Sequence, residues 1–215
     1  RMPAAKAHRY LVSFVRTGLA TQDPISGRYD LGHFALDLGL ASLARLDAVR
    51  VATPALDALA EDLGETVALA VWGNMGPTIV RWVESRRPVT VNLRTGAVMP
   101  LLHSAIGRCY VAFFESPQLQ RKIDEELLIN ARGEDTRAPI TAAELDALKM
   151  EAREHGMSRT VGSVIPGINA FAAPVFDHDG KMALAIAGLG PAGLVPPHWN
   201  GRMPKALLAA AQELS

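Results

Sequence analysis

Lys6-Ala7-His8-Arg9-Tyr10-Leu11, then Gly18-Leu19-Ala20, then Asp23-Pro24-Ile25-Ser26-Gly27-Arg28-Tyr29-Asp30-Leu31-Gly32: these residues decide the fold at the start of the chain. Residues 4–17 carry apolar side chains at helical spacing, and the glycine that follows them is a natural end for a helix. Turn-forming residues then separate two short extended segments, a pattern typical of a hairpin. A helix that runs into a two-stranded ribbon is the ending of a winged helix-turn-helix, a fold that places a helix in the major groove of DNA.

The positive charge of the chain is gathered in this opening stretch. The first 32 residues hold five basic and two acidic residues, a net charge of +3, whereas the whole chain is formally neutral. This polarity predicts a head that faces a double-stranded DNA operator, joined to a body with another task.

Four residues are candidates for contact with DNA. A recognition helix uses its N-terminal half for bases and phosphates, and the wing touches the backbone nearby. Lys6, His8 and Arg9 are therefore the candidates on the helix, and Arg28 is the candidate on the wing. The alternative for the basic residues is the solvated face of an ordinary helix, and His8 fits an internal, packed position equally well.

The composition sets the class of the protein. With 215 residues, 49% hydrophobic and 20% charged, the chain is globular and not disordered. It has neither a signal peptide pattern nor an apolar run near the ~18 residues of a membrane span, so we expect a cytoplasmic protein without membrane contact. Its single cysteine, Cys109, excludes an internal disulfide framework. No histidine has partners at metal-ligand spacing, so we expect no metal and no other cofactor.

Beyond the head, the pattern predicts a linker and an α+β body. Residues 33–46 form a short apolar helix, suited to joining two domains or to pairing with a second copy. Residues 47–215 predict an antiparallel sheet flanked by helices. Helices are expected at 46–63, 104–114, from 117 onward, 141–156 and 203–214, and strands at 65–72, 78–84, 89–92, 168–176 and 182–189.

A series of short blocks carries a resemblance to a known family. In the head they are Ala7-His8-Arg9-Tyr10-Leu11, Gly18-Leu19, Asp23-Pro24, Gly27-Arg28-Tyr29, Leu31-Gly32 and Leu38-Gly39. In the body they are Met99-Pro100-Leu101-Leu102-His103-Ser104-Ala105-Ile106-Gly107-Arg108, Gly167, Ala172-Ala173-Pro174-Val175-Phe176-Asp177, Gly180 and Gly190-Pro191. Each block alone is only moderately specific. In this order and at this spacing, they resemble the IclR-type family of bacterial transcriptional regulators.

The resemblance implies three parts and an assembly. Residues 1–32 are expected to be the C-terminal part of a winged helix-turn-helix, residues 33–46 a linker helix, and residues 47–215 a GAF/profilin-like effector domain. The family assembles as homodimers or homotetramers on DNA. Two helices normally precede the recognition helix, so we expect a further segment before Arg1 and a truncated head that lacks much of its own core.

The resemblance also implies an effector pocket in the body. A GAF-like fold holds a small molecule between its sheet and the elements over one face. The helix that starts at Ser104 offers free backbone amides to a carboxylate. Carried over residue by residue, the family's pocket positions fall on Ala105 and Ile106 at this helix start and on Thr160, Ile168, Ala170, Ala187 and Leu189 on the far wall. The alternative for these strand residues is ordinary core.

The expected effector is a carboxylic acid with an apolar body. Several far-wall positions are serine or acidic in family members that bind very small oxo-acids, whereas Ala187 and Leu189 are apolar and Thr160 is uncharged. A buried polar group left unpaired costs about 1–3 kcal/mol. We therefore expect an aromatic carboxylate or a ring-cleavage product in preference to glyoxylate or pyruvate. Trp72 and Met75 are further candidates for the roof of the pocket.

These patterns predict a transcriptional regulator whose operator binding responds to a small carboxylic acid. The alternative is a GAF-like small-molecule-binding module or enzyme whose basic head only serves assembly. Against an enzyme, the sequence offers no Ser–His–Asp or Cys–His set with a credible orienting group. Cys109 is expected to be an inert buried thiol, and a packing or capping role is favoured for His103 over contact with the ligand.

Overall fold

The structure is a computed structural model of the chain, and it describes residues 3–44, 47–85, 93–132 and 137–215. The chain forms two compact units, residues 1–50 and residues 51–215, each with its own internal packing. The boundary between them falls inside the helix α3 (Asp47–Leu63).

The head unit is a helix, a hairpin and a second helix. Helix α1 (Ala4–Arg16) leads into β1 (Ala20–Gln22), which pairs antiparallel with β2 (Tyr29–Leu31), and α2 (His33–Ala44) follows. Gly18, between α1 and β1, has a φ of 77°, a left-handed conformation that favours glycine. Its carbonyl accepts a hydrogen bond from the Phe34 amide at 3.1 Å, and a Cβ on Gly32 would lie only 2.0 Å from the same oxygen. The end of α1 and the start of α2 are therefore packed backbone against backbone.

The hairpin turn is held by Asp23. Its Oδ1 accepts hydrogen bonds from the amides of Ser26 at 2.7 Å and Ile25 at 2.8 Å, and its own amide donates to the Arg28 carbonyl at 2.9 Å. The two amides that bond its carboxylate lower the pKa of Asp23 below its ordinary value. The turn predicted from Asp-Pro and Ser-Gly has thus formed with the aspartate as its hydrogen-bond acceptor.

The apolar residues of the head are only partly covered within the described chain. On α1, Tyr10 is 48% exposed and Phe14 is 43% exposed. Helix α2 has no single apolar face, and Phe34, Leu36, Leu38 and Leu40 on it are exposed. One helix, a hairpin and a second helix bury too little surface to form a closed core.

The body is built on a five-stranded antiparallel sheet in the order β4-β3-β7-β6-β5. Strand β4 is one edge and β5 is the other. The sheet contains β3 (Thr66–Gly73), β4 (Gly76–Val83), β5 (Ser158–Val161), β6 (Ile168–Phe176) and β7 (Met182–Pro191).

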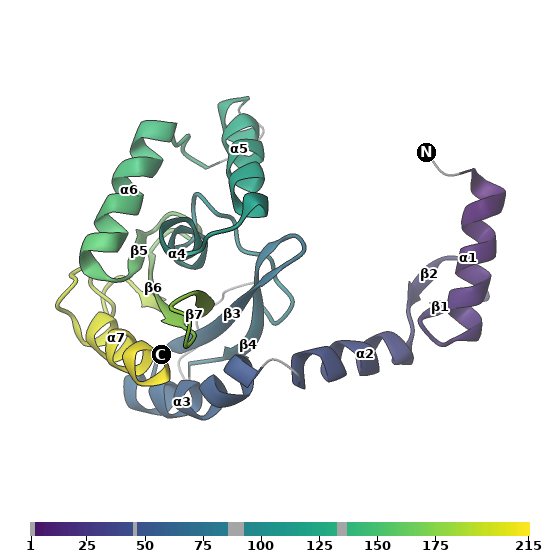
Figure 1. Ribbon diagram of the computed structural model, residues 1–215, viewed down its shortest axis with the longest axis horizontal. Helices are drawn as coiled ribbons and strands as arrows, with labels where there is room; N and C mark the ends of the chain where they lie inside the picture. The colour runs from purple at the N-terminus through teal and green to yellow at the C-terminus, as the bar shows by residue number, and fades with distance from the viewer. Residues whose placement is uncertain (1–2, 45–46, 86–92, 133–136) are drawn as a thin grey trace. The chain divides into compact units, whose positions relative to one another are not determined.

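Helices cover both faces of this sheet (Figure 1). Helix α4 lies across β5, β6 and β7 on one face, with α6 packed against it, while α3 and α7 lie on the other face. On β7, Gly188 lets α7 approach closely, because a Cβ there would meet the Met203 sulfur at 2.9 Å. The helices are α4 (Ala105–Phe113), α5 (Pro117–Ala131), α6 (Ala142–His155) and α7 (Arg202–Leu214).

The helix caps predicted from the sequence are present. The Ser104 hydroxyl accepts from the Gly107 amide, and the Ser116 hydroxyl accepts from the Gln118 amide. Helix α6 begins with a full capping box between Thr141 and Glu144, and it ends at Gly156 in the left-handed conformation. These caps fix where α4, α5 and α6 begin, and α4 carries part of the site described below.

The predicted α+β class is confirmed, with one strand missed and one left undescribed. Strand β5 (Ser158–Val161) was not predicted, since four residues with three polar or charged side chains give no readable alternation of polar and apolar residues. It is a strand because it pairs with β6 along its whole length. The segment 89–92, predicted as a strand, lies outside the described residues.

Candidate functional site

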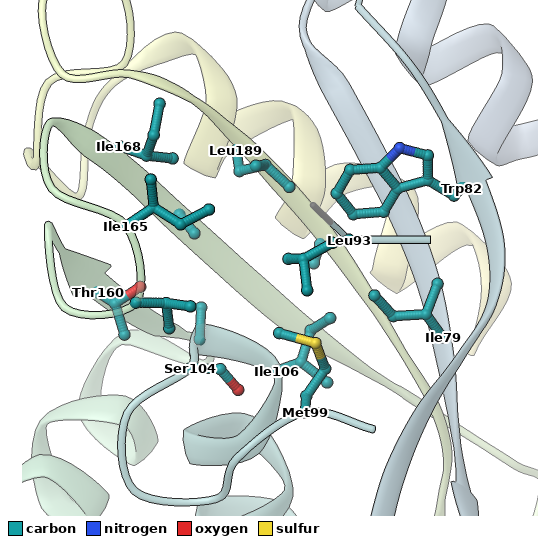
Figure 2. Close-up of a pocket in the computed structure, with 14 residues that line it drawn as sticks. Ile79, Trp82, Leu93, Met99, Ser104, Ile106, Thr160, Ile165, Ile168 and Leu189 are labelled. Atoms are coloured by element: carbon teal, nitrogen blue, oxygen red, sulfur yellow. The ribbon is translucent and has the colours of Figure 1, made fainter. Parts of the chain in front are cut away.

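A single pocket in the body brings together all seven positions expected to bind the effector. It opens between α4, the ends of β5, β6 and β7, and β4 (Figure 2). The residues expected there from the sequence are Ala105, Ile106, Thr160, Ile168, Ala170, Ala187 and Leu189, and the structure adds Ile79, Trp82, Leu93, Met99, Ser104, Val164 and Ile165.

The start of α4 provides hydrogen-bond donors at this pocket. Of the first four amides of a helix, none has an acceptor within the helix. Here the Ser104 amide donates to the Pro100 carbonyl, and the Gly107 amide donates to the Ser104 hydroxyl. The amides of Ala105 and Ile106 have no acceptor among the described residues. They carry the positive end of the helix dipole, which favours an anion.

Strand β5 brings a hydroxyl to the same end of the pocket. Thr160 is buried, and Figure 2 places it on the pocket wall near Ser104. Two side chains tie β5 to the start of α4. The Ser158 hydroxyl donates to the Ala105 carbonyl at 2.6 Å. Arg108 donates from Nε to the Leu102 carbonyl at 2.8 Å and from Nη1 to the Arg159 carbonyl at 3.2 Å.

Arg108 is a positive charge that sits partly inside the protein. Burial lowers the pKa of its guanidinium, and the nearby Glu151 carboxylate opposes that effect. Its hydrogen-bond partners among the described residues are backbone carbonyls, while Glu151 forms its ion pair with Arg159 at 2.7 Å. Arg108 therefore fixes the distance between the two polar walls of the pocket.

The remaining walls are apolar, and small residues on the sheet leave space for the cavity. On the face toward α4, alanine occupies every second residue along parts of β3, β6 and β7. These alanines share one core cluster with the α4 side chains. Ala170 and Ala187 form the floor of the pocket itself. A larger side chain at either position would fill the space.

A β-bulge places two residues of β4 on the same wall. Leu69 of β3 pairs with Arg81 and the next residue, Ala70, pairs with Ile79, so Val80 has no partner in the ladder. Side chains alternate along a regular strand, and residues 79 and 82 would then face opposite sides. The extra residue at the bulge reverses that alternation, so Ile79 and Trp82 both line the pocket.

The remaining wall is the loop between β5 and β6. Val164 and Ile165 from this loop line the pocket. The loop is bounded by Gly162 and Gly167, both with positive φ, and the Gly162 amide donates to the Ile168 carbonyl at 3.0 Å. The space that the centre of a water-sized molecule can occupy is about 40 Å³. An aromatic acid is larger than this space.

Three residues considered from the sequence lie outside this pocket. Trp72 stacks on Phe114 with ring centroids 4.9 Å apart, and Met75 is exposed, so the suggestion that they roof the pocket is wrong. On β3 the residue beside the pocket is Ala68, which pairs with Trp82 and Ala187, and Trp72 lies four residues further along the strand, about 13 Å away. His103 is buried, with its Nε2 3.2 Å from the Asn130 amide nitrogen, in the packing role favoured for it.

Chemistry by side-chain nucleophiles or metal ions finds little support in the described residues. The Cys109 thiol is fully buried in α4, and burial raises its pKa, so it is present as the unreactive neutral form. No group of three or more histidine, cysteine, aspartate or glutamate side chains that could hold a metal ion occurs in the described part of the chain.

The four residues expected to contact DNA are all exposed on the head. Lys6, His8 and Arg9 lie on α1, and Arg28 lies between the hairpin turn and β2. His8 is exposed, so the alternative of an internal packed position does not hold within the described chain.

The sequence profile of the family described as "Bacterial transcriptional regulator IclR C-terminal" matches residues 40–215. The chain belongs to the IclR family of bacterial transcriptional regulators. The match includes every residue of the pocket, and the resemblance inferred from the sequence blocks is confirmed.

Individual IclR relatives extend the similarity over the head. BhcR of Paracoccus denitrificans, an HTH-type transcriptional regulator, is 27% identical over 214 residues, which are 100% of this chain and 76% of BhcR. The glycerol operon regulatory protein of Streptomyces griseus is 30% identical over 190 residues, 88% of this chain and 71% of that protein. The crystal structure of Pseudomonas aeruginosa HmgR is 36% identical with a TM-score of 0.70, covering 100% of this chain and 84% of HmgR.

Membership of the IclR family settles the class of the protein. BhcR and the glycerol operon regulatory protein are both named as regulators, and family membership confirms the expectation that this chain is a regulator and not an enzyme. IclR regulators bind DNA and effectors and form oligomers. No helix among the described residues is both long and apolar enough to cross a membrane.

Proposed function

We propose that this IclR regulator senses a carboxylic acid with an apolar, aromatic or ring-derived body, bound in the pocket at the start of α4. The observation that carries the proposal is the pairing of two free backbone amides, Ala105 and Ile106, with walls that hold no charged side chain. A carboxylate satisfies those amides through charge-assisted hydrogen bonds. The apolar remainder of the ligand is matched by the isoleucine, leucine and alanine walls.

The shape of the pocket supports a role in regulation. We infer that a ligand larger than the present cavity moves β4 and the loop 162–167, which form two of its walls, away from α4. It therefore stabilises one arrangement of the body over another. An effector shifts an equilibrium only by its difference in affinity for the two states, and this pocket supplies such a difference.

The acid-binding proposal is tested by removing one amide. Ala105 is the first residue of α4, a position where proline is well tolerated, and Ser104 before it is extended. We expect wild-type protein to bind benzoate or phenylacetate at least about tenfold more tightly than the corresponding amides. Ala105→Pro should remove most of this preference in calorimetric titration.

Ala105→Val is the matched control. It adds similar bulk to the pocket but keeps the N–H group, so affinity falls for acid and amide together while their ratio remains. A ratio that survives in Ala105→Pro would contradict the role of the α4 amides.

We place the operator contact on α1 and the hairpin, through Lys6, His8, Arg9 and Arg28. All are exposed, and none of them forms an ion pair among the described residues. Lysine and arginine contacts to phosphate release counterions, so they set how steeply affinity falls with salt.

Replacement of Lys6 and Arg9 by alanine in the complete regulator should weaken operator binding and flatten its salt dependence by about 0.9 per lost phosphate contact. Lys205→Ala, on the exposed side of α7, removes one positive charge from the body and should leave the slope unchanged. An unchanged slope in the Lys6→Ala/Arg9→Ala variant would contradict this assignment.

The linker helix α2 is proposed to couple two copies of the chain. Its apolar side chains point in all directions and are exposed within one copy. Pairing of two such helices would bury them and place two heads on the half-sites of a palindromic operator. The effector would then act through the arrangement of the pair.

A further inference from the structure

We infer that Trp82 is the specificity-determining residue of the pocket and that it selects acids carrying a single flat aromatic ring. The inference rests on the proposed binding of a carboxylic acid at α4 and names the part of the ligand that the α4 amides do not reach. Trp82 is the one aromatic residue among the described residues that line the pocket.

The orientation of Trp82 is imposed by the backbone. The unpaired residue Val80 shifts the register of β4 against β3, and this shift turns Trp82 to the same side as Ile79. Without the bulge, the indole would face the side covered by α3, where its neighbour Arg81 forms an ion pair with Asp57 at 2.6 Å. The bulge at Val80 therefore turns the large aromatic side chain of Trp82 into the pocket.

The pocket is polar at one end and aromatic at the other. Ser104 and Thr160, with the free amides of α4, lie at one end, and Trp82 lies across the cavity beside Leu189 and Ile79 (Figure 2). In the same view the six-membered ring of the indole is turned toward the cavity and the ring nitrogen away from it. A ligand anchored by its carboxylate at α4 therefore presents its far end to an apolar aromatic surface.

This geometry favours a flat ring over a saturated ring of the same size. Aromatic pairs take offset or edge-to-face arrangements that contribute beyond their buried area. The cavity is also narrow, with about 40 Å³ open to the centre of a water-sized molecule. Trp82 lies on β4 and is only half-buried, so its ring faces the cavity without being enclosed by the core. A puckered ring is thicker and gains no aromatic contact.

The test compares benzoate and phenylacetate with cyclohexanecarboxylate and cyclohexylacetate by calorimetric titration. Wild-type protein is expected to prefer the aromatic member of each pair by about tenfold. Trp82→Leu keeps an apolar wall without the ring, and it should bring the ratio to about one while acid binding persists. Trp82→Phe should retain most of the preference.

Trp72→Phe is the matched control, because Trp72 stacks on Phe114 and packs at a tilt against Tyr110, outside the pocket. It should leave the ratio unchanged, and circular dichroism establishes that each variant is folded. If Trp82→Leu loses affinity for aromatic and saturated acids by the same factor, the assignment of Trp82 is overturned. Absence of binding by all four acids to wild-type protein would instead overturn the proposed function, and the inference with it.

Discussion

Leu184 in the body and Leu36 in the head are the same residue type, each on a regular element, yet Leu184 is 0% exposed and Leu36 is 60% exposed. The difference runs through both units. The body closes its core within one chain, between a five-stranded sheet and the helices on its two faces. The head carries apolar side chains that its own elements do not cover. A closed body suits a unit that holds a small molecule, and an uncovered head suits a unit that functions in contact with something else.

The leucine pair measures this comparison directly. Leu184→Ala should lower the free energy of unfolding of the body by about 2–5 kcal/mol, since it leaves a cavity in a closed core. Leu36→Ala should cost less than about 0.5 kcal/mol in dilute, monomeric protein. Chemical denaturation at several protein concentrations checks both. A cost for Leu36→Ala that grows with concentration would sharpen the account, by showing that a second copy covers α2.

Two glycines make a second matched pair. A Cβ at Gly107 would lie 2.0 Å from the Pro100 carbonyl oxygen, and a Cβ at Gly32 would lie 2.0 Å from the Gly18 carbonyl oxygen. Gly107→Ala should destabilise the body by about 3 kcal/mol, since backbone atoms on both sides cannot yield. Gly32→Ala should leave the main thermal transition in place while weakening operator binding. Similar loss of the main transition in both variants would contradict the independence of the two units.

Substitutions of Arg108 test whether its hydrogen bonds hold the start of α4 and strand β5 at a fixed distance across the pocket. Arg108→Leu removes the donors to the Leu102 and Arg159 carbonyls and should cost about 1–3 kcal/mol of stability, together with affinity for acids. Arg108→Lys keeps the charge and can restore one of the two bonds. If the lysine variant binds acids no better than the leucine variant although both are folded, the positive charge contributes nothing to anion binding.

The smallest expected effect is a loss of folding stability of the body at alkaline pH. Burial raises the pKa values of the Cys109 thiol and the Tyr110 hydroxyl in the folded body above the ordinary values of 9.0 and 10.0. Both groups stay protonated in the folded state but release protons when unfolded. Stability is therefore fully present below about pH 9 and falls as the pH rises, by about 1.4 kcal/mol per unit for each group.

Denaturation series between pH 7 and 11 should show this fall in the free energy of unfolding, and Cys109→Ala should make the fall less steep. A pH-independent unfolding free energy up to pH 11 would refute the buried state of these two groups.

The sequence could predict those features that depend on local chemistry. A few neighbouring residues encode each of these features: the caps at Ser104 and Thr141, the Asp23 turn, and the apolar periodicity of α3 and α7. The seven pocket positions came from the family resemblance, and the structure brings them into one cavity. Whether they bind an effector remains a prediction.

The features that escaped the sequence depend on pairing between distant segments. Strand β5 exists because β6 lies beside it, and nothing in Ser158–Val161 alone predicts a strand. The contribution of Trp82 to the pocket required the bulge at Val80, which appears only in the register of β4 against β3. For the same reason Trp72, on a regular strand, was the wrong tryptophan to place over the pocket.

The most direct test of the central claim is a thermal-shift screen of this chain with aliphatic and aromatic carboxylic acids and their neutral amides, followed by mass spectrometry of each ligand. An effector at about 100 times its Kd adds roughly 2.7 kcal/mol and should raise the midpoint by about 5–11 °C. We predict that aromatic acids raise it, that their amides do not, and that the acids are recovered unchanged. A shift by the amides alone, or chemical consumption of the acid, would contradict a carboxylate sensor.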